Sequence, residues 1–596
     1  MKRLLVLLLF LATPAMAADW YFSDCATYCQ DGAVAIGTGA CTGAGTDINN
    51  PICLDWDNDG SDEGWGYVQD GTAPEVGSGD TVYLCCGDCD GAGTCTHNQD
   101  DVITIQNAGP VTVSGYPGET VTYDGGSTVA DYTLGVVRHV YVTVETYDDW
   151  TFQNYNLQHY QSYFFHALNA PDGWTIQNMT MKWLDALQDD SSVGDTSTCG
   201  KGYAGDTYGI YFRTGNPSGA PTATLTIANI DMHSICKFAL RFNSLSNGTA
   251  IIVEDNTFYN MAGVTNGFNN SGQRIRRNTV YDVEVPFSEE WGTIDLIIED
   301  NIIECRGTYN MDSGRCQQAI QINESDNPPG EIDGICNDII IRRNKIIGYA
   351  SSGQGSWYSG ITYLCECLDS NGCVTLNATI ENNFLQRIVP NITGGTCLGP
   401  RHGLSLITNK PVTVRHNTIR ESSLGMIICG NGTVAHNVYG NIIEDPLDAL
   451  PGVWIEADAA SSTFNDNNVY RNSEVSNVII DYAGGGTDRN CSAINLWDSG
   501  TNICLPTDFV ADTGGPETWD LHLDATDTNN IDAGDCTSGP TEDIDQGART
   551  ATCDIGADER GSPAGIDPTY KGVTLSELKA WSCEMREKTG AGACFP

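Results

Sequence analysis

The sequence predicts an all-β protein, a right-handed parallel β-helix in which a single chain winds through successive coils. Three regularities predict this fold. A short motif containing asparagine returns at nearly constant spacing, the charge two positions before that asparagine alternates in sign, and a second motif of alternating apolar residues accompanies it.

The asparagine motif has the frame apolar–x–x–Asn–x–apolar. Its asparagines are Asn256, Asn278, Asn301, Asn344, Asn383, Asn417, Asn437 and Asn467. The shortest intervals between them are 20, 22 and 23 residues, the length of one coil. An asparagine at a bend can donate its amide to the asparagine of the next coil and tolerates a left-handed backbone, so we expect a stacked ladder. Three earlier segments, around Asn154, Asn178 and Asn229, have a frame one residue shorter. The alternative is a β-sandwich with unrelated asparagines at strand ends.

Charged residues stand two positions before six of these asparagines. In order they are Glu254, Arg276, Glu299, Arg342, Glu381 and Arg415. Neighbouring coils lie about 4.8 Å apart, so each arginine would lie beside glutamates and like charges would not face each other. We interpret the series as a structural column of ion pairs rather than a binding site.

A second strand in each coil has the pattern small–apolar–x–apolar–x. It occurs at residues 209–213, 239–243, 319–323, 360–364, 403–407, 425–429 and 452–456. Its period of two places alternate residues inside. The predicted inner residues are Ile210, Phe212, Leu240, Phe242, Ile320, Ile322, Leu404 and Leu406. The predicted outer residues are Tyr211, Arg213, Arg241, Asn243, Gln321, Asn323, Trp454 and Glu456.

The start of the chain has the pattern of a secretory signal peptide over residues 1–17. Lys2 and Arg3 precede an apolar run from Leu4 to Leu11, and Ala15-Met16-Ala17 resembles a cleavage site. The run is too short to span a bilayer, and we expect a secreted or cell-surface protein without a membrane span. A buried N-terminal strand is the alternative.

Beyond the signal, the sequence divides into three parts. Residues 18–76 form a Gly/Cys-rich N-terminal cap, residues 77–560 the parallel β-helix, and residues 561–596 a C-terminal capping tail. Within the tail, the segment TLSE (574–577) has the form of a capping box ahead of a short helix.

The 24 cysteines predict disulfide bonds, because all of them follow the signal and nothing outside the cell keeps thiols reduced. The densest group, Cys85, Cys86, Cys89 and Cys95, has zinc binding as an alternative. The formal net charge of −48 argues against a nucleic-acid partner, whose phosphates need a basic surface. It suits calcium, a saline exterior or solubility alone.

A family resemblance supports the fold. GSGDTVYLC (77–85) and the segment 101–126 resemble the opening coils of pectate-lyase-like parallel β-helix proteins. NNIDAGD (529–535) and the segment 543–559 are similar to the closing coil of secreted members. The resemblance implies the fold and an extracellular polysaccharide or glycan as partner. It does not fix an activity, since the superfamily includes lyases, hydrolases, epimerases and non-catalytic adhesins.

An acidic run in the predicted cap resembles a calcium loop. Its candidate metal ligands are Asp55, Asp57, Asp59, Asp62 and Glu63, with Gly60 allowing a sharp turn. An EF-hand needs a glutamate where Gly66 stands, so we expect a structural Ca²⁺ of another kind. A solvated acidic loop is the alternative.

The resemblance implies that catalysis, if present, occurs on the outer face of one sheet. β-Elimination of uronate sugars, which we favour over hydrolysis, needs a base near the C5 proton and positive charge on the carboxylate. The candidate catalytic residues are Lys237, Arg241 and Arg213. The candidate sugar-binding residues on the same face are Tyr211, Asn243, Gln321 and Asn323. A solvated or ion-paired polar face is the alternative.

Two further candidates lie elsewhere in the sequence. Arg401 and His402, in GPRHGL, resemble an Arg-His-Gly element of chondroitinase- and alginate-lyase-like β-helices and add to the substrate-binding candidates. Glu289 and Glu290, beside Trp291, offer the paired carboxylates of a hydrolase, with a surface acidic pair as the alternative. The rival to any enzyme is an adhesive or structural β-helix, and the oligomeric state does not follow from the sequence.

Overall fold

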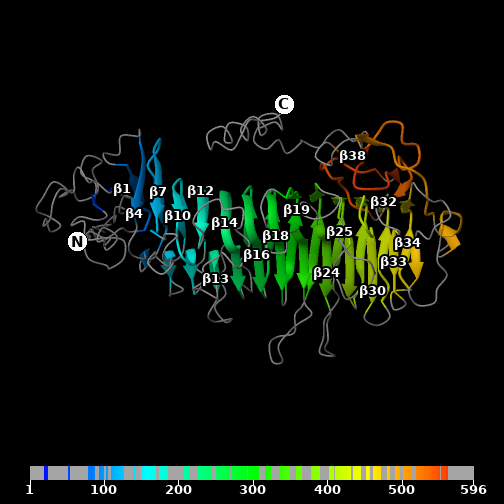
Figure 1. The fold of residues 1–596 in the computed structure, drawn as a ribbon, viewed down its shortest axis with the longest axis horizontal. Helices are drawn as coiled ribbons and strands as arrows, with labels where there is room; N and C mark the ends of the chain where they lie inside the picture. Colours follow the sequence, from blue (N-terminus) through cyan, green and yellow to red (C-terminus); the bar gives the residue numbers. More distant parts are fainter. Residues whose placement is uncertain are drawn as a thin grey trace, which may run out of the picture. The chain divides into compact units, whose positions relative to one another are not determined.

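The computed structural model describes residues 19–23, 52–53 and, with gaps, 78–560. It divides into two compact units. Unit 1 comprises residues 1–297, 304–336 and 353–355, and unit 2 comprises residues 298–303, 337–352 and 356–596. Strands β19 (Ile294–Glu299) and β20 (Ile302–Cys305) are divided between the units. Each unit is a stack of parallel strands (Figure 1), and the fold is the predicted right-handed parallel β-helix.

Unit 1 contains three parallel sheets. The first consists of β1 (Asp19–Ser23), β3 (Thr81–Cys85), β6 (Val111–Gly115), β9 (Trp150–Gln153), β12 (Thr175–Leu184), β14 (Leu225–Asn243), β15 (Ile251–Glu254) and β17 (Gln273–Arg276). The second consists of β4 (Thr94–Asn98), β7 (Thr120–Asp124), β10 (Asn156–Gln158), β12, β14, β16 (Thr257–Phe268) and β18 (Thr279–Glu290). The third consists of β5 (Ile103–Thr104), β8 (Arg138–Val142), β11 (Tyr163–Ala167), β13 (Tyr208–Arg213), β14, β16, β18 and β21 (Cys316–Asn323).

Unit 2 repeats this arrangement with shorter strands. Its first sheet consists of β22 (Asn337–Arg342), β25 (Ala378–Glu381), β28 (Val412–Arg415), β31 (Asn437–Tyr439) and β34 (Thr463–Asn465). The second consists of β23 (Lys345–Gly348), β26 (Phe384–Gln386), β29 (Thr418–Arg420), β32 (Ile442–Glu444) and β35 (Asn468–Tyr470). The third consists of β24 (Trp357–Cys365), β27 (Leu404–Thr408), β30 (Met426–Gly430), β33 (Val453–Ile455) and β36 (Ile480–Tyr482).

The core of each unit is made of stacked inward rows, as the period-two pattern predicts. Ile210, Leu240 and Ile320 of unit 1 are 0% exposed, and so are Leu404 and Leu406 of unit 2. Because every coil contributes the same inward positions, burial of apolar side chains stabilises the stack continuously along its length.

The bends between strands contain single residues with left-handed backbone. In the motif coils this residue is not the ladder asparagine, as the sequence predicts, but its neighbour. In the motif coils the residue with positive φ precedes the ladder asparagine, as at Asp255 (φ 58°) before Asn256. In the three shorter frames Asn154, Asn178 and Asn229 themselves have positive φ. The next positions, Tyr155, Met179 and Ile230, are the buried equivalents of the ladder asparagine. The shorter frames therefore mark the same bend, with an apolar residue at the ladder position.

The asparagine ladder is present in both units. In unit 1 Asn256 donates from Nδ2 to Oδ1 of Asn278 at 3.0 Å. In unit 2 the same bond links each asparagine to the next at 2.9–3.2 Å, in the order Asn301, Asn344, Asn383, Asn417, Asn441, Asn467 and Asn502. Asn437 was predicted in this series and is not part of it. It is the exposed first residue of β31, and Asn441 holds the ladder position.

The alternating charges form ion pairs, as predicted. Glu254 and Arg276 are register partners and lie 2.7 Å apart in unit 1. In unit 2 Arg342 binds Glu299 at 2.7 Å, and Arg415 binds Glu381 at 2.7 Å. Arg342 and Glu381 are also register partners, so the column is continuous within the unit.

Disulfide bonds are present in both units. The pairs include Cys86–Cys95, Cys305–Cys316, Cys491–Cys504 and Cys536–Cys553. Cys85 is also disulfide-bonded. The alternative of a zinc site at Cys85, Cys86, Cys89 and Cys95 is therefore wrong, although Cys89 itself lies outside the described residues.

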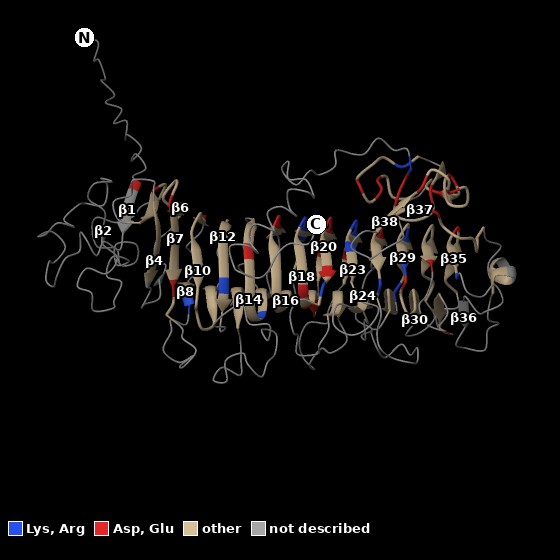
Figure 2. Ribbon diagram, turned by 45° about the horizontal axis from the view of Figure 1, so that its top comes forward, with Lys and Arg blue, Asp and Glu red and all other residues tan. Residues whose placement is uncertain are grey.

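The end of unit 2 differs from a closing coil. We name residues 503–559 the closing segment. Its described residues form the antiparallel pairs β37 (Phe509–Ala511) with β38 (Asp520–Leu523) and β39 (Gly534–Asp535) with β40 (Thr552–Cys553). Their apolar residues Leu521, Ile544 and Ile555 pack with Phe384 and Ile442 on the outside of the second sheet. Acidic residues gather on this segment (Figure 2). Ile503 still pairs in parallel with Asn468 of β35, whereas the apolar residues from Phe509 onward cover the side of the coils.

The ends of the chain are described only in part. The register of β1 with β3 runs from Asp19↔Thr81 to Ser23↔Cys85, so a strand of the predicted cap belongs to the first sheet. The predicted signal peptide, the predicted calcium loop and the C-terminal tail with its short helix lie outside the described residues. None of the helices in the described part of the chain has the length and apolar content of a membrane span.

Candidate functional site

The third sheet of unit 1 places most of the predicted catalytic and sugar-binding residues in two rows on its outer side. The first row is Tyr141, His166, Tyr211, Arg241, Asn266, Ser288 and Gln321, each the register partner of the next. The second row contains Arg213 beside Asn243, and Glu290 beside Asn323. We call these two rows the Arg241 face. Strand spacing places successive side chains of a row about 4.8 Å apart.

Arg241 lies at the centre of the first row. Its guanidinium donates to the hydroxyl of Tyr208 and lies 4.6 Å from the centre of the Tyr208 ring and 5.5 Å from that of Tyr211. Burial raises the pKa of Glu290, and the hydrogen bond from Ser288 and the positive charge of Arg241 oppose this rise. Arg241 is therefore positioned by aromatic rings and balanced by a carboxyl in the next row.

His166 is a site residue that the sequence did not single out. Its ring stacks on Tyr163 at 4.3 Å and on Tyr211 at 5.1 Å, and Nδ1 lies 3.1 Å from the Arg138 guanidinium. Burial first, and then the charge of Arg138, lower the pKa of His166 to about 4. Arginine only donates, so Nδ1 accepts and the neutral ring carries its proton on Nε2.

The sequence contains a pattern that could have predicted the positions of Tyr141 and His166. The strands β8 and β11 contain RHVYV and YFFHA, whose register with YGIYFR places Tyr141 and His166 in the row of Tyr211. Both lack the small first residue of the strand motif, since His139 and Phe164, two buried rings, stand at that position. Allowing that substitution extends the motif two coils toward the N-terminus.

Lys237 lies outside the two rows. The register between β14 and β16 is irregular between Ile235 and Phe238, which places Lys237 at the bend of β14. Its side chain is half-buried. The structure therefore brings Arg213 and Arg241 onto one face and leaves Lys237 at its edge.

Glu289 and Glu290 do not form a catalytic pair. Glu289 points inward and is 0% exposed, whereas Glu290 points outward beside Ser288. Two carboxylates on opposite sides of a strand cannot flank one glycosidic bond. The hydrolase alternative built on these residues is wrong.

The second sheet of unit 1 carries another aromatic series. His233 stacks on Tyr259 at 4.5 Å, Tyr259 on Tyr281 at 4.7 Å, and Arg306 lies 4.1 Å from the centre of the Tyr281 ring. The ring faces contact one another, so they are not open for a sugar to stack on. We interpret this series as a structural ladder.

The remaining predicted binding residues are in unit 2. His402 is buried, and its backbone carbonyl accepts hydrogen bonds from Gly360 N and Ser359 Oγ at the bend of the third sheet. Arg401 lies outside the described residues.

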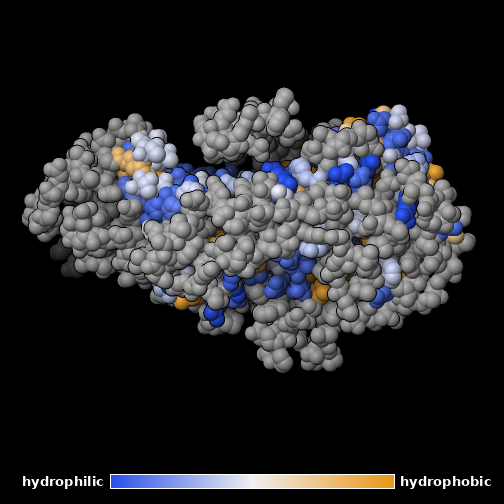
Figure 3. Space-filling model, viewed as in Figure 1, coloured by the Kyte–Doolittle hydropathy of each residue, from blue (hydrophilic) through white to orange (hydrophobic). Residues whose placement is uncertain are grey.

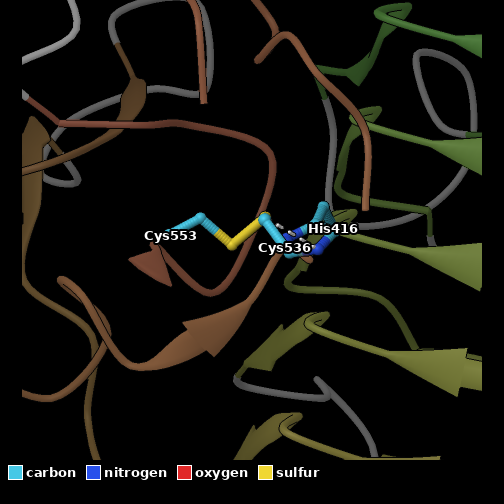
Figure 4. Close-up of side chains that lie close together, drawn as sticks. All are labelled: His416, Cys536 and Cys553. Carbon is cyan, nitrogen blue, oxygen red and sulfur yellow. Dashed lines mark hydrogen bonds between the residues drawn. A yellow bond between two sulfur atoms is a disulfide. The ribbon is translucent and has the colours of Figure 1, made fainter. Parts of the chain in front are cut away.

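Three groups of side chains in the described residues have the spacing of metal ligands. In two of them both cysteines form a disulfide: Cys536–Cys553 beside His416 (Figure 4) and Cys305–Cys316 beside Asp282. The third group is His522, Asp545 and Asp558. Burial alone would lower the pKa of His522, but hydrogen bonds to Asp520 and Asp545 outweigh it and raise that pKa to about 10. A protonated imidazole is not a metal ligand.

No protein-family model and no curated protein matches the chain. Several solved structures resemble it. A crystal structure of pectate lyase Pel9A is 13% identical over 91% of this chain and 96% of its own, with a TM-score of 0.33. A PL6 alginate lyase in complex with a trisaccharide is 11% identical over 75% and 87%, with a TM-score of 0.39. PfbA, a surface adhesin of Streptococcus pneumoniae, is 9% identical over 69% and 86%, with a TM-score of 0.26.

The likeness is one of fold. The chain resembles pectate-lyase-like parallel β-helix proteins, as the end motifs predict. At these identities and TM-scores, the comparisons carry no conclusion about activity or substrate.

Proposed function

We propose that this protein binds an anionic extracellular polysaccharide on the Arg241 face. The observation that carries the proposal is the first row of that face, where His166, Tyr211 and Arg241 occupy three successive coils. One polar side chain per coil lets such a row follow an extended polymer along the helix axis. Arginine favours carboxylate groups, which it can bind through two parallel hydrogen bonds.

Charge supports an anionic ligand. The chain has 77 acidic and 29 basic residues, so its long-range field repels a polyuronate. A cluster of arginines is therefore required to hold such a polymer, and Arg138, Arg213 and Arg241 lie on this one sheet. The described residues visible in Figure 3 are mostly hydrophilic, with small separate apolar patches, which suits a polar polymer.

The manner of sugar contact follows from the rings. Tyr163, His166 and Tyr211 stack on one another, so their faces are occupied. His166, Tyr211, Asn266 and Ser288 are also buried, so the groups that this face exposes at least in part are the guanidinium groups of Arg213 and Arg241 and the side-chain amides described next. Asn243, Gln321 and Asn323 provide amides suited to sugar hydroxyls.

If the protein cleaves its ligand, uronate elimination remains the leading chemistry. Arg241 and Arg213 would hold the carboxylate of the sugar and stabilise the charge that develops when the C5 proton leaves. Arginine stays protonated, so Lys237 is the better candidate for the base.

Non-catalytic adhesion is the second candidate. It is favoured by the position of Lys237 outside the rows and by the engagement of His166 Nδ1 with Arg138. Neither the amine of Lys237 nor Nδ1 of His166 is placed in the described rows as a free base. Binding without cleavage therefore explains the Arg241 face equally well.

The test is a panel of polysaccharides, each measured for binding, unsaturated products and new reducing ends. Arg241→Ala should weaken binding about ten- to a hundred-fold, the worth of one charge-assisted contact of roughly 1.5–3 kcal/mol. Arg274→Ala is the matched control, because Arg274 lies on β17 and binds Asp295 at 2.8 Å. Equal binding by both variants contradicts the proposed site, and binding without products selects adhesion.

We also propose a structural Ca²⁺ at Asp55, Asp57, Asp59, Asp62 and Glu63. Alternating carboxylates before a glycine suit a hard cation that takes six to eight oxygen ligands. Removal of calcium with a chelator should lower the unfolding temperature of the wild type, and Asp57→Asn should reduce that response.

Export of the chain is a further part of the proposal. It is supported by the basic and apolar start of the sequence and by the disulfide bonds in both units. Expression of the full chain with secretion, followed by N-terminal sequencing, should find Ala18 as the first residue.

A further inference from the structure

A carboxyl group is enclosed in the core of unit 1, directly behind the Arg241 face. Glu289 lies on β18, and its register partners are Gly267 on β16 and Ile322 on β21. Its side chain points inward and is 0% exposed. A carboxyl in such a place is neutral or paired unless its ionisation changes the structure.

The partners of this carboxyl are neutral. Gln273 donates from Nε2 to Oε2 at 2.8 Å, and Thr265 donates from Oγ to Oε1 at 3.1 Å. Both partners are 0% exposed. In the described part of the chain, no lysine, arginine or histidine forms an ion pair with Glu289.

The charged groups nearby do not compensate an ionised Glu289. Its neighbour Glu290 adds repulsion, and Arg241, on the outer side of the sheet, acts on Glu290. From β21 the partner is the apolar Ile322, and from β16 and β17 the partners are Gly267, Thr265 and Gln273. A neutral carboxyl keeps both hydrogen bonds, because its oxygens still accept from Gln273 Nε2 and from Thr265 Oγ.

The chain makes room for this group. A Cβ atom on Gly267 would lie 1.8 Å from Oε2 of Glu289 and 2.6 Å from its Cδ. Only glycine at position 267 lets the carboxyl occupy this space. The Glu289 side chain is therefore packed as part of the core and is not a surface side chain that has turned inward.

We propose that protonation of Glu289 holds the β16–β18 region closed and that its ionisation opens this region. The strands concerned also carry the outer rows. Asn266 lies between Thr265 and Gly267 on β16, and Ser288 and Glu290 flank Glu289 on β18. Opening these strands therefore displaces part of the Arg241 face, whatever that face binds.

The direction of the pH effect follows from the burial. Desolvation is the largest influence and raises the pKa of Glu289 to about 7, although the bonds from Gln273 and Thr265 oppose it. An exposed glutamate titrates near 4.3, so the opened form loses its proton first. The equilibrium constant for closing is largest below about pH 4, falls about tenfold per pH unit up to about pH 7, and is constant above that pH.

The test is hydrogen–deuterium exchange of the full-length protein between pH 5 and pH 8. Glu289→Gln mimics the protonated form. Over this pH range, the equilibrium constant for opening of the segment Thr265–Gln273 should rise about a hundred-fold in the wild type relative to this variant. Thr265→Val removes a donor to the ionised carboxyl, so its transition should move to higher pH. Glu304→Gln is the matched control, because Glu304 is buried but accepts from Arg306 at 2.7 Å. It should behave as the wild type.

Each result decides the matter. Equal pH dependence in the wild type and Glu289→Gln overturns the proposal, and so does a Thr265→Val transition at unchanged or lower pH. If Glu289→Gln does not fold, infrared spectroscopy of the wild type replaces it. The band of a buried protonated carboxyl should disappear between pH 5 and pH 8, and its absence at pH 5 refutes the inference.

Discussion

At the scale of single residues, hydrogen-bond satisfaction explains why the asparagines matter. Asn417 accepts from the Nδ2 of Asn383 at 2.9 Å, donates to Asn441 at 3.0 Å, and is 0% exposed. Its backbone N also donates to Asn441 Oδ1 at 3.0 Å. A buried amide satisfied on every side fixes the register of consecutive coils.

The ladder makes a prediction that separates position from residue type. Asn417→Ala should lower the free energy of unfolding by about 2–4 kcal/mol, because it leaves buried donors of Asn383 without an acceptor. Asn437→Ala, at the exposed asparagine that only the sequence places in the ladder, should change it by less than about 0.5 kcal/mol. Chemical denaturation measures both, and equal losses contradict the assignment.

At the scale of the elements, the sequence predicts the inward rows, the charge column and the ladder because each repeats along the chain. It misplaces Asn437 since HNVYGN offers two asparagines to one frame, and only the bend at Gly440 (φ 67°) selects Asn441. The sequence analysis did not identify His166, because its strand lacks the small residue with which the strand motif begins. The closing segment could not be predicted as a lateral cover, because its contacts with Phe384 and Ile442 join residues far apart in the chain.

The closing segment has a pH-sensitive attachment. Arg387 and Arg420 each lie 4.9 Å from the centre of the Trp519 ring. His522 bridges Asp520 and Asp545 within the closing segment, and Asp545 lies 3.7 Å from Lys345 of β23. The pKa of His522 is raised to about 10, so its contribution is complete below about pH 6.5, the ordinary histidine value, and is lost as pH rises toward 10.

His522→Gln should remove this dependence. Limited proteolysis between pH 6 and pH 10 should show the closing segment of the wild type becoming more susceptible as pH rises. The variant should start more susceptible and change less. Parallel pH profiles for the two proteins contradict the role of His522.

At the scale of the whole molecule, the disulfide bonds and the stacked core act together. The bond Cys305–Cys316 closes the chain between β20 and β21, and Cys536–Cys553 joins the two strands β39 and β40. Such bonds restrict the unfolded chain and keep long connections near the coils. An oxidising exterior is the environment in which they persist.

Thiol chemistry tests this account of the molecule. Titration of the native and the denatured protein without reductant should find almost none of the 24 cysteines reactive. Many reactive thiols in the denatured, unreduced protein would contradict both the stabilisation by disulfide bonds and the export. Reduction before heating should lower the unfolding temperature.

The central claim is that the Arg241 face is where the protein meets its polysaccharide. Hydrogen–deuterium exchange of the full chain, with and without a polysaccharide that it binds in the panel, tests this most directly. The account predicts slower exchange in the bound state at β13, at the Phe238–Asn243 part of β14 and at the Val285–Glu290 part of β18, with no change at β15 and β17. Protection confined to unit 2, or to the first sheet of unit 1, would contradict it.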